Sequence, residues 1–358
     1  MYFAYNNIIL QPTTFCNLDC DYCYLYDRDK NQKMLFTVIE HLALHLSHSK
    51  KKISLIWHGG EPLSCGIDYF SKLIKPLSDT LVRGKIRQSI QTNCTLVTDE
   101  WCDLFKTHNI RIGISIDGPE SFNVQRKDWK QRPIYNKILK GIEILKRNNV
   151  PFSVIAVINQ KHYNQGEEIY NYFVQLGCTS IGFNTQEQEG QNEGDGLDTN
   201  EINNFWKSIF EAWQKNPVIR VREISNALSW MNHVCSNQIE KNFSNVIDFI
   251  PTIAWNGDVV VLSPELNGAK SEKHNNFVVG NVLQHSLKEI LSNAQQASYV
   301  QEFVEGYNLC QDTCEYFSYC GGGQASNKFF ENGSLATAET SYCRNTKKRV
   351  INSILESI

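Results

Sequence analysis

Three cysteines near the start of the chain, Cys16, Cys20 and Cys23, form a CxxxCxxC triplet just after a short apolar run. Thiolates are soft ligands for iron, and three of them on one loop can ligate three irons of a 4Fe-4S cluster. The fourth iron would have no ligand from the protein, so a cofactor could bind there. A zinc knuckle that lacks one ligand and a chance grouping are the alternatives. The triplet therefore predicts a 4Fe-4S cluster with one open iron.

A second group of cysteines, Cys310, Cys314, Cys320 and Cys343, lies near the end of the chain. Four thiolates can ligate every iron of a second cluster, and they equally satisfy tetrahedral zinc. Spacing alone leaves these two metal sites open. We interpret the remaining five cysteines as small core or surface side chains because they are scattered.

Six apolar or β-branched runs alternate with amphipathic stretches, which is the pattern of βα units around a parallel sheet. The predicted strands are 8–11, 53–57, 86–91, 110–117, 152–158 and 180–183. The predicted helices between them are 38–46, 69–77, 100–107, 135–147 and 166–176. Because a closed TIM barrel has eight units, the sequence predicts an α/β fold with a partial (β/α)6 TIM-like barrel.

The pattern changes after the sixth unit. Residues 186–200 are rich in Gly, Glu and Asn and predict an exposed loop. An aromatic helix with a buried face follows at 205–213, and a hairpin is predicted around Asn256-Gly257. We therefore divide the chain into a barrel of residues 1–225 and a second domain of residues 226–358, which carries the second cysteine group and a C-terminal helix.

Bulk properties restrict the partners and the compartment. The net charge of -3 gives no basic field for nucleic acid or an anionic membrane. The chain shows neither a signal-peptide pattern nor an apolar run of membrane-spanning length. Twelve cysteines fit clustered metal ligands in a reducing compartment. These features predict a cytoplasmic protein that binds neither nucleic acid nor membrane.

Polar and glycine-rich segments follow the next predicted strands. They read WHGGEPL at 57–63, QTN at 91–93 and SIDGP at 115–119. The carboxyl ends of barrel strands are where ligands bind, although each segment alone could be an ordinary turn. With the cysteine triplet, they resemble the GGEP, TN and SxDG motifs of the radical S-adenosylmethionine (SAM) superfamily.

The resemblance implies that SAM chelates the open iron through its amino and carboxylate groups. An electron from the cluster would then break a carbon-sulfur bond of SAM and produce a 5′-deoxyadenosyl radical. The implied SAM-binding residues are Tyr22 near the adenine, Gly59, Gly60, Glu61 and Pro62 at the amino group, Ser115 and Arg126 at the carboxylate, and Asn93 and Asp117 in the polar surroundings.

The second cysteine group resembles the SPASM extension of radical SAM peptide maturases, which shifts our interpretation from zinc to an auxiliary 4Fe-4S cluster. The sequence departs from the SPASM pattern in one respect. Val261 and Gln324 stand where cysteines are expected, and no cysteine lies in the fifteen residues before Gly257. We therefore predict that the first auxiliary cluster is absent and that the second, with four cysteine ligands, is kept in a SPASM-like iron-sulfur domain.

Further strings, including LSPEL at 262–266 and SNKFFENG at 326–333, are similar to SPASM-type maturases that form three-residue cyclophanes, among them the group acting on glycine-rich repeat peptides. This resemblance implies a precursor peptide as substrate and an external electron donor such as flavodoxin or ferredoxin. It implies a carbon-carbon bond between an aromatic ring and the β-carbon of a nearby residue. Glu265 is the candidate base, and an exposed surface glutamate is the alternative reading.

Two other functions remain open. A sulfatase-type or thioether-forming radical SAM maturase would use similar chemistry on a serine or cysteine. A non-catalytic, zinc-bound peptide-binding protein would use the cysteines for structure alone.

Overall fold

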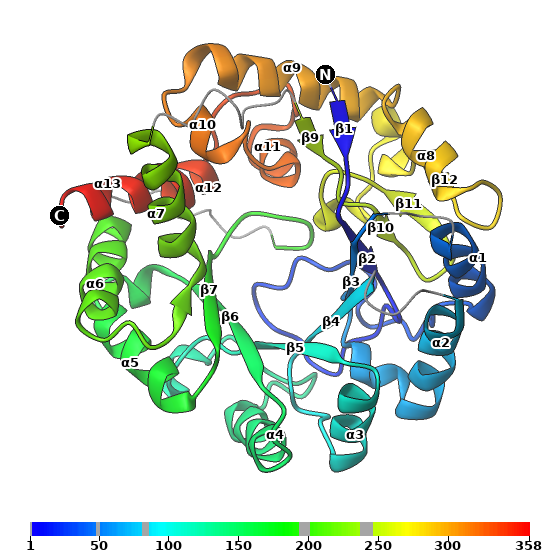
Figure 1. The fold of residues 1–358 in the computed structure, drawn as a ribbon, viewed down its shortest axis with the longest axis horizontal. Helices are drawn as coiled ribbons and strands as arrows, with labels where there is room; N and C mark the ends of the chain where they lie inside the picture. The colour runs from blue at the N-terminus through cyan, green and yellow to red at the C-terminus, as the bar shows by residue number, and fades with distance from the viewer. Residues whose placement is uncertain (1, 48–50, 81–85, 193–200, 237–245) are drawn as a thin grey trace.

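A computed structural model describes residues 2–47, 51–80, 86–192, 201–236 and 246–358. One curved ten-stranded sheet forms its centre (Figure 1). Six parallel strands follow one another in chain order: β2 (Asn7–Leu10), β3 (Ile53–Trp57), β4 (Ile86–Thr92), β5 (Ile110–Ser115), β6 (Phe152–Ile158) and β7 (Ser180–Thr185). The predicted α/β fold with six βα units is confirmed.

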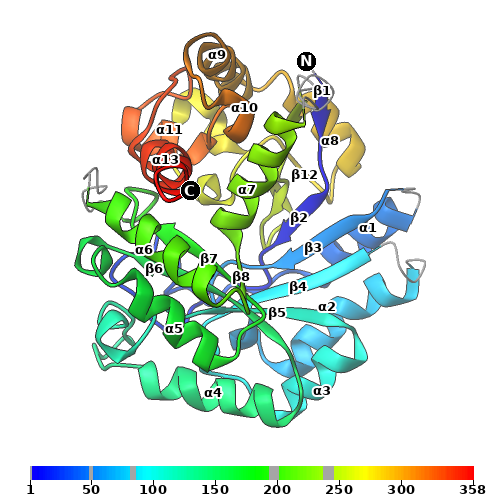
Figure 2. The ribbon, with the colours of Figure 1, turned by 60° about the vertical axis from the view of Figure 1, so that its left-hand side comes forward.

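Helices cover the outer face of this sheet (Figures 1 and 2). They are α1 (Phe36–Ser47), α2 (Ile67–Thr80), α3 (Asp99–Thr107), α4 (Tyr135–Arg147), α5 (Gly166–Leu176) and α6 (Ile202–Lys215). Each buries an apolar stripe; in α4, for example, Ile138, Ile142 and Leu145 are buried. Three-residue and four-residue spacings place these side chains on one helical face. Short 3-10 helices occur at Pro62–Cys65, Glu120–Phe122, Gln160–His162, Pro264–Leu266 and Glu272–Phe277.

Short strands extend the sheet at both edges. Beyond β7 lies β8 (Arg220–Val221), and beyond β2 lie β10 (Thr252–Ile253), β11 (Asp258–Val260) and β12 (Gly280–Asn281). A separate pair joins β1 (Tyr2–Ala4) to β9 (Val246–Asp248). The antiparallel pairing of β10 with β11 confirms the predicted hairpin, and Gly257 in its turn has a φ of 90° that favours glycine.

The C-terminal part of the chain fills the gap in the ring of barrel strands, at the top of Figure 1. Its helices are α7 (Arg222–Cys235), α8 (Leu287–Ala294), α9 (Ser298–Thr313), α10 (Phe317–Cys320), α11 (Ala325–Asn332), α12 (Ser341–Cys343) and α13 (Arg349–Leu355), with a π-helical turn at Arg344–Lys348. The proposed division after residue 225 lies within α7, and the sheet continues across it. Trp206 of α6 also donates a hydrogen bond to the carbonyl of Asn345 over 2.8 Å.

The predicted exposed loop at 186–200 is confirmed as a loop over residues 186–192, but only Gln188 and Gln191 are exposed there. Glu189 and Asn192 are buried there, while residues 193–200 lie outside the described ranges. The segment folds back because Gly190, with a φ of 56°, packs against the Tyr24 carbonyl, to which the Gln191 amide donates over 3.0 Å. Polar composition predicted solvent exposure, but Gln186, Glu187 and Glu189 line a polar cavity instead. No helix in the described ranges is both long and apolar enough to cross a bilayer.

Candidate active site

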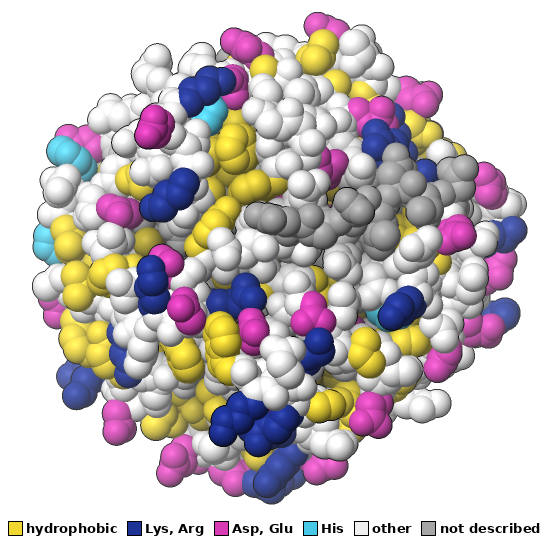
Figure 3. Space-filling model, turned by 180° about the vertical axis from the view of Figure 1, so that it is seen from behind, with side chains coloured by type: hydrophobic (Ala, Val, Ile, Leu, Met, Phe, Trp, Pro, Cys, Tyr) yellow, Lys and Arg dark blue, Asp and Glu magenta, His cyan; other side chains and the backbone are white. Residues whose placement is uncertain are grey.

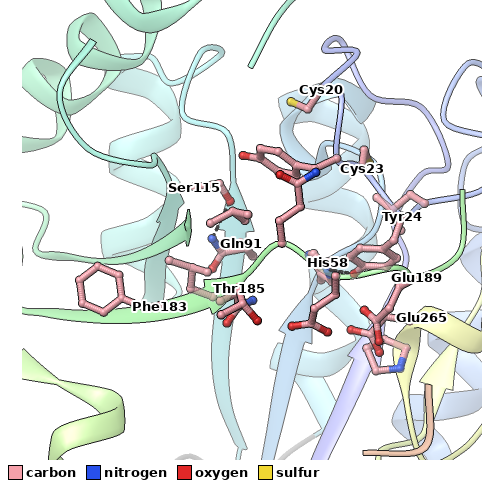
Figure 4. Close-up of a pocket in the computed structure, with 18 of the residues that line it drawn as sticks. Cys20, Cys23, Tyr24, His58, Gln91, Ser115, Phe183, Thr185, Glu189 and Glu265 are labelled. Atoms are coloured by element: carbon pink, nitrogen blue, oxygen red, sulfur yellow. Dashed lines mark hydrogen bonds between the residues drawn. The ribbon is translucent and has the colours of Figure 1, made fainter. Parts of the chain in front are cut away.

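A cavity of about 570 Å³ lies between the carboxyl ends of the barrel strands and the C-terminal part of the chain (Figure 4). Such strand ends are where barrel enzymes place their reactive groups. Ten residues predicted from the sequence line this cavity: Cys16, Cys20, Tyr22, Cys23, Gly60, Glu61, Asn93, Ser115, Arg126 and Glu265. Three others, Gly59, Pro62 and Asp117, lie behind its wall.

The loop with the first three cysteines is held from several sides. Trp129 donates its ring nitrogen to the Cys16 carbonyl over 2.8 Å. Arg28 binds Asp19 over 2.7 Å and reaches the Cys23 carbonyl at 3.3 Å. These contacts fix the loop from outside and leave its thiols facing the cavity.

The three thiols fit a 4Fe-4S cluster with one open iron. Cys16, Cys20 and Cys23 are free of disulfides, and within the described residues no other cysteine lines the cavity. The site therefore offers three soft ligands on one wall and open volume beside them, which is the donor set that such a cluster requires.

Glu61 ties the glycine-rich segment after β3 to the end of β4. One of its oxygens accepts from the Leu63 amide at 3.0 Å and from the Thr92 hydroxyl at 2.7 Å, and the other accepts from the Asn93 amide at 2.7 Å. Burial raises the pKa of the Glu61 carboxyl to about 7, and these hydrogen bonds oppose that rise. Because both oxygens are occupied, the side chain positions the segment, and the neighbouring Gly60 is exposed to the cavity.

Asn93 connects the end of β4 to the cysteine loop. Its side-chain nitrogen donates to Asn17 over 2.9 Å and lies 3.9 Å from the Cys16 sulfur. At the end of β5, the Ser115 hydroxyl accepts from Gln91 at 2.8 Å. Both predicted residues therefore lie at the barrel mouth, beside the cysteines and the cavity.

Asp117 and Arg126 form a buried ion pair. Two guanidinium nitrogens of Arg126 contact the two carboxylate oxygens of Asp117, each at 2.9 Å. Asp117 also accepts from the Tyr22 hydroxyl at 2.7 Å and from the Val157 amide at 2.9 Å. The Arg126 guanidinium lies over the Tyr22 ring, so the three predicted residues form one unit whose cavity side is Tyr22 and Arg126.

Buried carboxylates line the cavity at some distance from the cysteines. Figure 4 shows Glu189 and Glu265 next to each other, below Tyr24 and away from Cys20. Burial, together with repulsion from Glu265, raises the pKa of Glu187 to about 8 and that of Glu189 well above its usual range. Glu265 is half-buried on the cavity wall, so it is not an exposed surface glutamate, and burial raises the pKa of its carboxyl.

The second cysteine group also comes together. Cys310 lies in α9, Cys314 ends that helix, Cys320 ends α10 and Cys343 ends α12. Burial raises the pKa of Cys310 and Cys343, and the nearby Cys320 adds to both rises. The ammonium of buried Lys328 lies 3.5 Å from the Cys310 sulfur. Across the described residues, no three Cys, His, Asp or Glu side chains are grouped closely enough for one metal ion. A four-iron cluster places one thiolate on each iron and spreads its ligands further.

Sequence reasoning missed several residues of the cavity wall. Glu187 and Glu189 follow β7, and their position after the sixth strand was the available signal, since barrel sites form at that edge. Tyr24 and His58 were also missed; the Tyr24 hydroxyl lies 2.7 Å from His58 Nε2. Burial lowers the pKa of His58 to about 4, so its ring is neutral.

Comparisons with known proteins cover nearly the whole chain. Residues 10–173 match the Radical SAM superfamily. An uncharacterised protein of Synechocystis, sll1766, is 33% identical over 356 residues, which are 95% of this chain and 88% of that protein. The chain belongs to the radical SAM superfamily. Membership implies a 4Fe-4S cluster and SAM as cofactors, and the cysteine triplet fits that cluster.

This radical SAM enzyme is also 27% identical over 363 residues to a serine-type anaerobic sulfatase-maturating enzyme of Bacteroides thetaiotaomicron, covering 90% of this chain and 83% of that enzyme. Among solved structures, native anSMEcpe with bound AdoMet and Cp18Cys peptide has a TM-score of 0.79 and 20% identity, covering 98% of this chain and 96% of its own. Streptococcus suis SuiB bound to precursor peptide SuiA has a TM-score of 0.67 and 13% identity, covering 95% and 76%. At these identities the structural likeness shows the fold.

Proposed function

We propose that the enzyme modifies a ribosomally made precursor peptide by forming a carbon-carbon cyclophane crosslink between an aromatic ring and the β-carbon of a nearby residue. One observation carries the proposal: a single cavity joins the three-cysteine loop to Glu187 and Glu189 after β7 and to Glu265 of the C-terminal part. The solved structures similar in fold include two with bound peptides, which supports a peptide substrate.

Two groups of residues have separate roles in the proposed reaction. Cys16, Cys20 and Cys23 would hold the cluster, which with SAM supplies a 5′-deoxyadenosyl radical that removes one hydrogen atom from the peptide. Forming the new bond then releases one proton and one electron. Glu265 is the proposed base, because it is half-buried on the cavity wall and burial raises the pKa of its carboxyl.

The second cysteine group is proposed to hold an auxiliary 4Fe-4S cluster that accepts the electron. The gathering of Cys310, Cys314, Cys320 and Cys343 around buried Lys328 supports this role, since a nearby ammonium compensates negative charge. Val261, where another ligand is expected, is fully buried in the apolar core, which supports the absence of a further cluster. An external flavodoxin or ferredoxin is the proposed electron donor.

A sulfatase-type maturase is the second candidate function. The 27% identity to the Bacteroides thetaiotaomicron enzyme favours it, because the match covers most of both chains. Its product would differ in kind: two-electron oxidation of a serine side chain gives a reactive aldehyde, whereas a cyclophane carries no new carbonyl group.

The test is anaerobic co-expression of the enzyme with the short peptide encoded beside its gene, followed by mass spectrometry of that peptide. A cyclophane predicts the loss of two hydrogens per crosslink, no fragmentation between the joined residues and no reaction with an aminooxy reagent. An aminooxy-reactive product would instead establish the sulfatase-type alternative. Zinc without labile sulfide in the purified protein would overturn both functions in favour of a zinc-bound peptide-binding protein.

A further inference from the structure

The cavity wall beyond the cysteines carries an excess of negative charge. Glu187 and Glu189 follow β7, and Glu265 comes from the short helix Pro264–Leu266 after β11. Arg126, which Asp117 holds, lines the cavity near the cysteines, and two further basic residues, Arg222 and Lys347, line it as well. The sequence motifs account for Glu265 alone, so the other two carboxylates need an explanation of their own.

The basic residues leave the pair Glu187 and Glu189 without a direct partner. Arg222 is bound to Glu223 at 2.7 Å and to the Phe183 carbonyl at 3.0 Å. The Lys347 ammonium lies over the ring of Tyr342, 5.7 Å from its centre. Glu61 and Glu223 also line the cavity, but hydrogen bonds already occupy Glu61 and Arg222 holds Glu223. This part of the wall therefore has three carboxylates against one ammonium that no carboxylate holds, which favours a positively charged occupant.

Two buried oxygen atoms of this wall have no hydrogen-bond partner. Thr185 is 3% exposed and its hydroxyl is unpartnered, and Glu189 is 7% exposed with its Oε1 unpartnered. Both residues line the cavity, and Figure 4 shows them among its wall residues. Buried polar atoms of folded proteins are nearly always hydrogen-bonded, so unpartnered ones beside open volume indicate a missing donor.

Other oxygens of the wall are already oriented. Glu187 accepts from the Asn327 side chain at 2.6 Å, and Glu265 accepts from Ser263. These contacts hold the two carboxylates in place before any ligand arrives. The unpartnered oxygens of Thr185 and Glu189 therefore lie beside carboxylates that are already fixed. Less conformational entropy is then lost when a ligand binds.

We infer that Glu187 and Glu189, with the Thr185 hydroxyl, form a subsite for a basic side chain of the peptide substrate. This inference rests on the proposed function and names a property of its substrate. A guanidinium suits the site best, because its planar fork of donors can reach several oxygens at once. With its basic side chain in this subsite, the peptide would place a neighbouring residue toward the cysteine loop.

The charges facing the pair agree with this assignment. Glu187 is repelled by Glu265 and Glu331 and attracted by Lys347, while Glu189 is repelled by Glu265, Glu187 and Glu331. Repulsion between these carboxylates disfavours their full ionisation when no ligand is bound, and a bound cation relieves that repulsion. Cation binding should therefore strengthen as the pH rises through about 8, because the Glu187 carboxyl releases its proton there.

Titration calorimetry of the anaerobic, cluster-loaded enzyme with SAM bound would test the subsite. The probes are N-acetyl-arginine methylamide, N-acetyl-lysine methylamide and N-acetyl-citrulline methylamide, the last a neutral analogue of the first. We expect the arginine probe to bind at least about tenfold more tightly than the citrulline probe, and this preference to be lost in Glu187→Gln/Glu189→Gln. Equal binding of the arginine and citrulline probes would overturn the inference.

Glu305→Gln on the exposed surface of α9 is the matched control, because it removes the same charge outside the cavity and should keep the preference. Iron content and melting temperature would show that the double variant is folded, so its loss of preference reports on the subsite. Stronger binding of lysine than arginine would keep the cationic subsite and overturn the assignment to a guanidinium. If the co-expressed peptide is modified while the probes show no preference, the inference fails and the proposed function stands. If the probes show the preference but the peptide is not modified, the cationic subsite stands and the proposed function fails.

Discussion

At the scale of single residues, buried charges of the site are held by other side chains before any cofactor binds. Arg126 and Asp117 share two hydrogen bonds, and Tyr22 completes the unit. Losing one partner of such a pair leaves an uncompensated charge in a medium of low dielectric constant. The Arg126 side chain therefore depends on Asp117 for its position at the cavity.

We predict that Asp117→Asn destabilises the protein by about 3–5 kcal/mol, because it leaves the Arg126 guanidinium buried without its carboxylate. Asp99→Asn is the control, since Asp99 pairs with Arg147 on the surface with both side chains more than half exposed. The control should cost at most about 1 kcal/mol. Anaerobic unfolding followed by circular dichroism measures both, and equal costs would contradict the burial argument.

Glu187 gives a second prediction at this scale, through the pH dependence of stability. Its carboxyl pKa is about 8 in the folded protein against about 4.5 when unfolded, so folding favours its protonated form. The stability that this proton confers is complete below pH 4.5 and is lost as the pH rises through 8.

Glu187→Gln mimics the protonated form, so we expect it to be more stable than the parent protein above pH 8, on the order of 2 kcal/mol. The two should be close in stability near pH 5. Melting curves of the peptide-free protein from pH 5 to 9 measure this difference. A constant difference across that range would show that the carboxyl does not titrate there.

Lys328 is the buried cation beside the second cysteine group, and it also donates to the Thr337 carbonyl. We predict that Lys328→Met lowers the reduction potential of the proposed auxiliary cluster, because it removes a positive charge and a hydrogen bond that would stabilise the reduced form. Redox titration followed by electron paramagnetic resonance measures the shift. Lys348→Met is the control: Lys348 pairs with Glu339 at 2.9 Å nearer the surface, and its removal should shift the potential less.

At the scale of elements, the segments between strands and helices position the site, and their backbone conformation matters more than their side chains. Gly60 has a φ of 61°, and an added Cβ would lie 2.5–2.7 Å from the carbonyl oxygens of Thr13, Thr14 and Phe15. The glycine therefore lets the segment after β3 pack directly against the start of the cysteine loop.

We predict that Gly60→Ala costs on the order of 3 kcal/mol and weakens SAM binding, because the clash separates these two segments. Gly333→Ala is the control, because it has the cost of a positive φ in a residue other than glycine but not the steric clash of an added Cβ. Gly333 has a φ of 70°, and nothing lies within 4 Å of an added Cβ, so about 1 kcal/mol is expected. Melting temperature and SAM affinity measure both variants, and similar losses would mean that backbone conformation alone explains Gly60.

The spacing of apolar residues predicted the ends of several strands and helices that bury one apolar face. The strands at 53–57 and 152–158 and the helices at 135–147 and 166–176 have the predicted ends. This spacing gave no sign of the burial of Glu189 and Asn192, because these polar residues carry no apolar pattern. Local motifs located the cysteines and the glycines, whereas Glu187 and Glu189 became site residues only through contacts with residues more than 70 positions later in the chain.

At the scale of the whole molecule, the C-terminal part completes a site that the barrel begins. The cavity is lined by residues from both parts, and the hydrogen bond from Trp206 to Asn345 joins α6 to the turn after Cys343. Cys343, a predicted ligand of the second cluster, follows directly on Tyr342, which lines the cavity of the first site. Cys343→Ala should reduce both the metal content and the stability of the chain, since binding of a structural metal group contributes to folding.

The number of clusters is a property of the complete chain, and it tests the predicted loss of the first auxiliary cluster. Two four-iron clusters predict about eight irons per chain after anaerobic reconstitution, whereas a third would give about twelve. Changing Cys16, Cys20 and Cys23 together to alanine should leave about four irons and abolish SAM cleavage. Changing Cys310, Cys314, Cys320 and Cys343 to alanine should also leave about four, with the remaining cluster still perturbed by SAM in electron paramagnetic resonance spectra. Iron and sulfide analysis measures the number of irons per chain. About four irons in the unmutated enzyme would show that the second cysteine group binds no cluster.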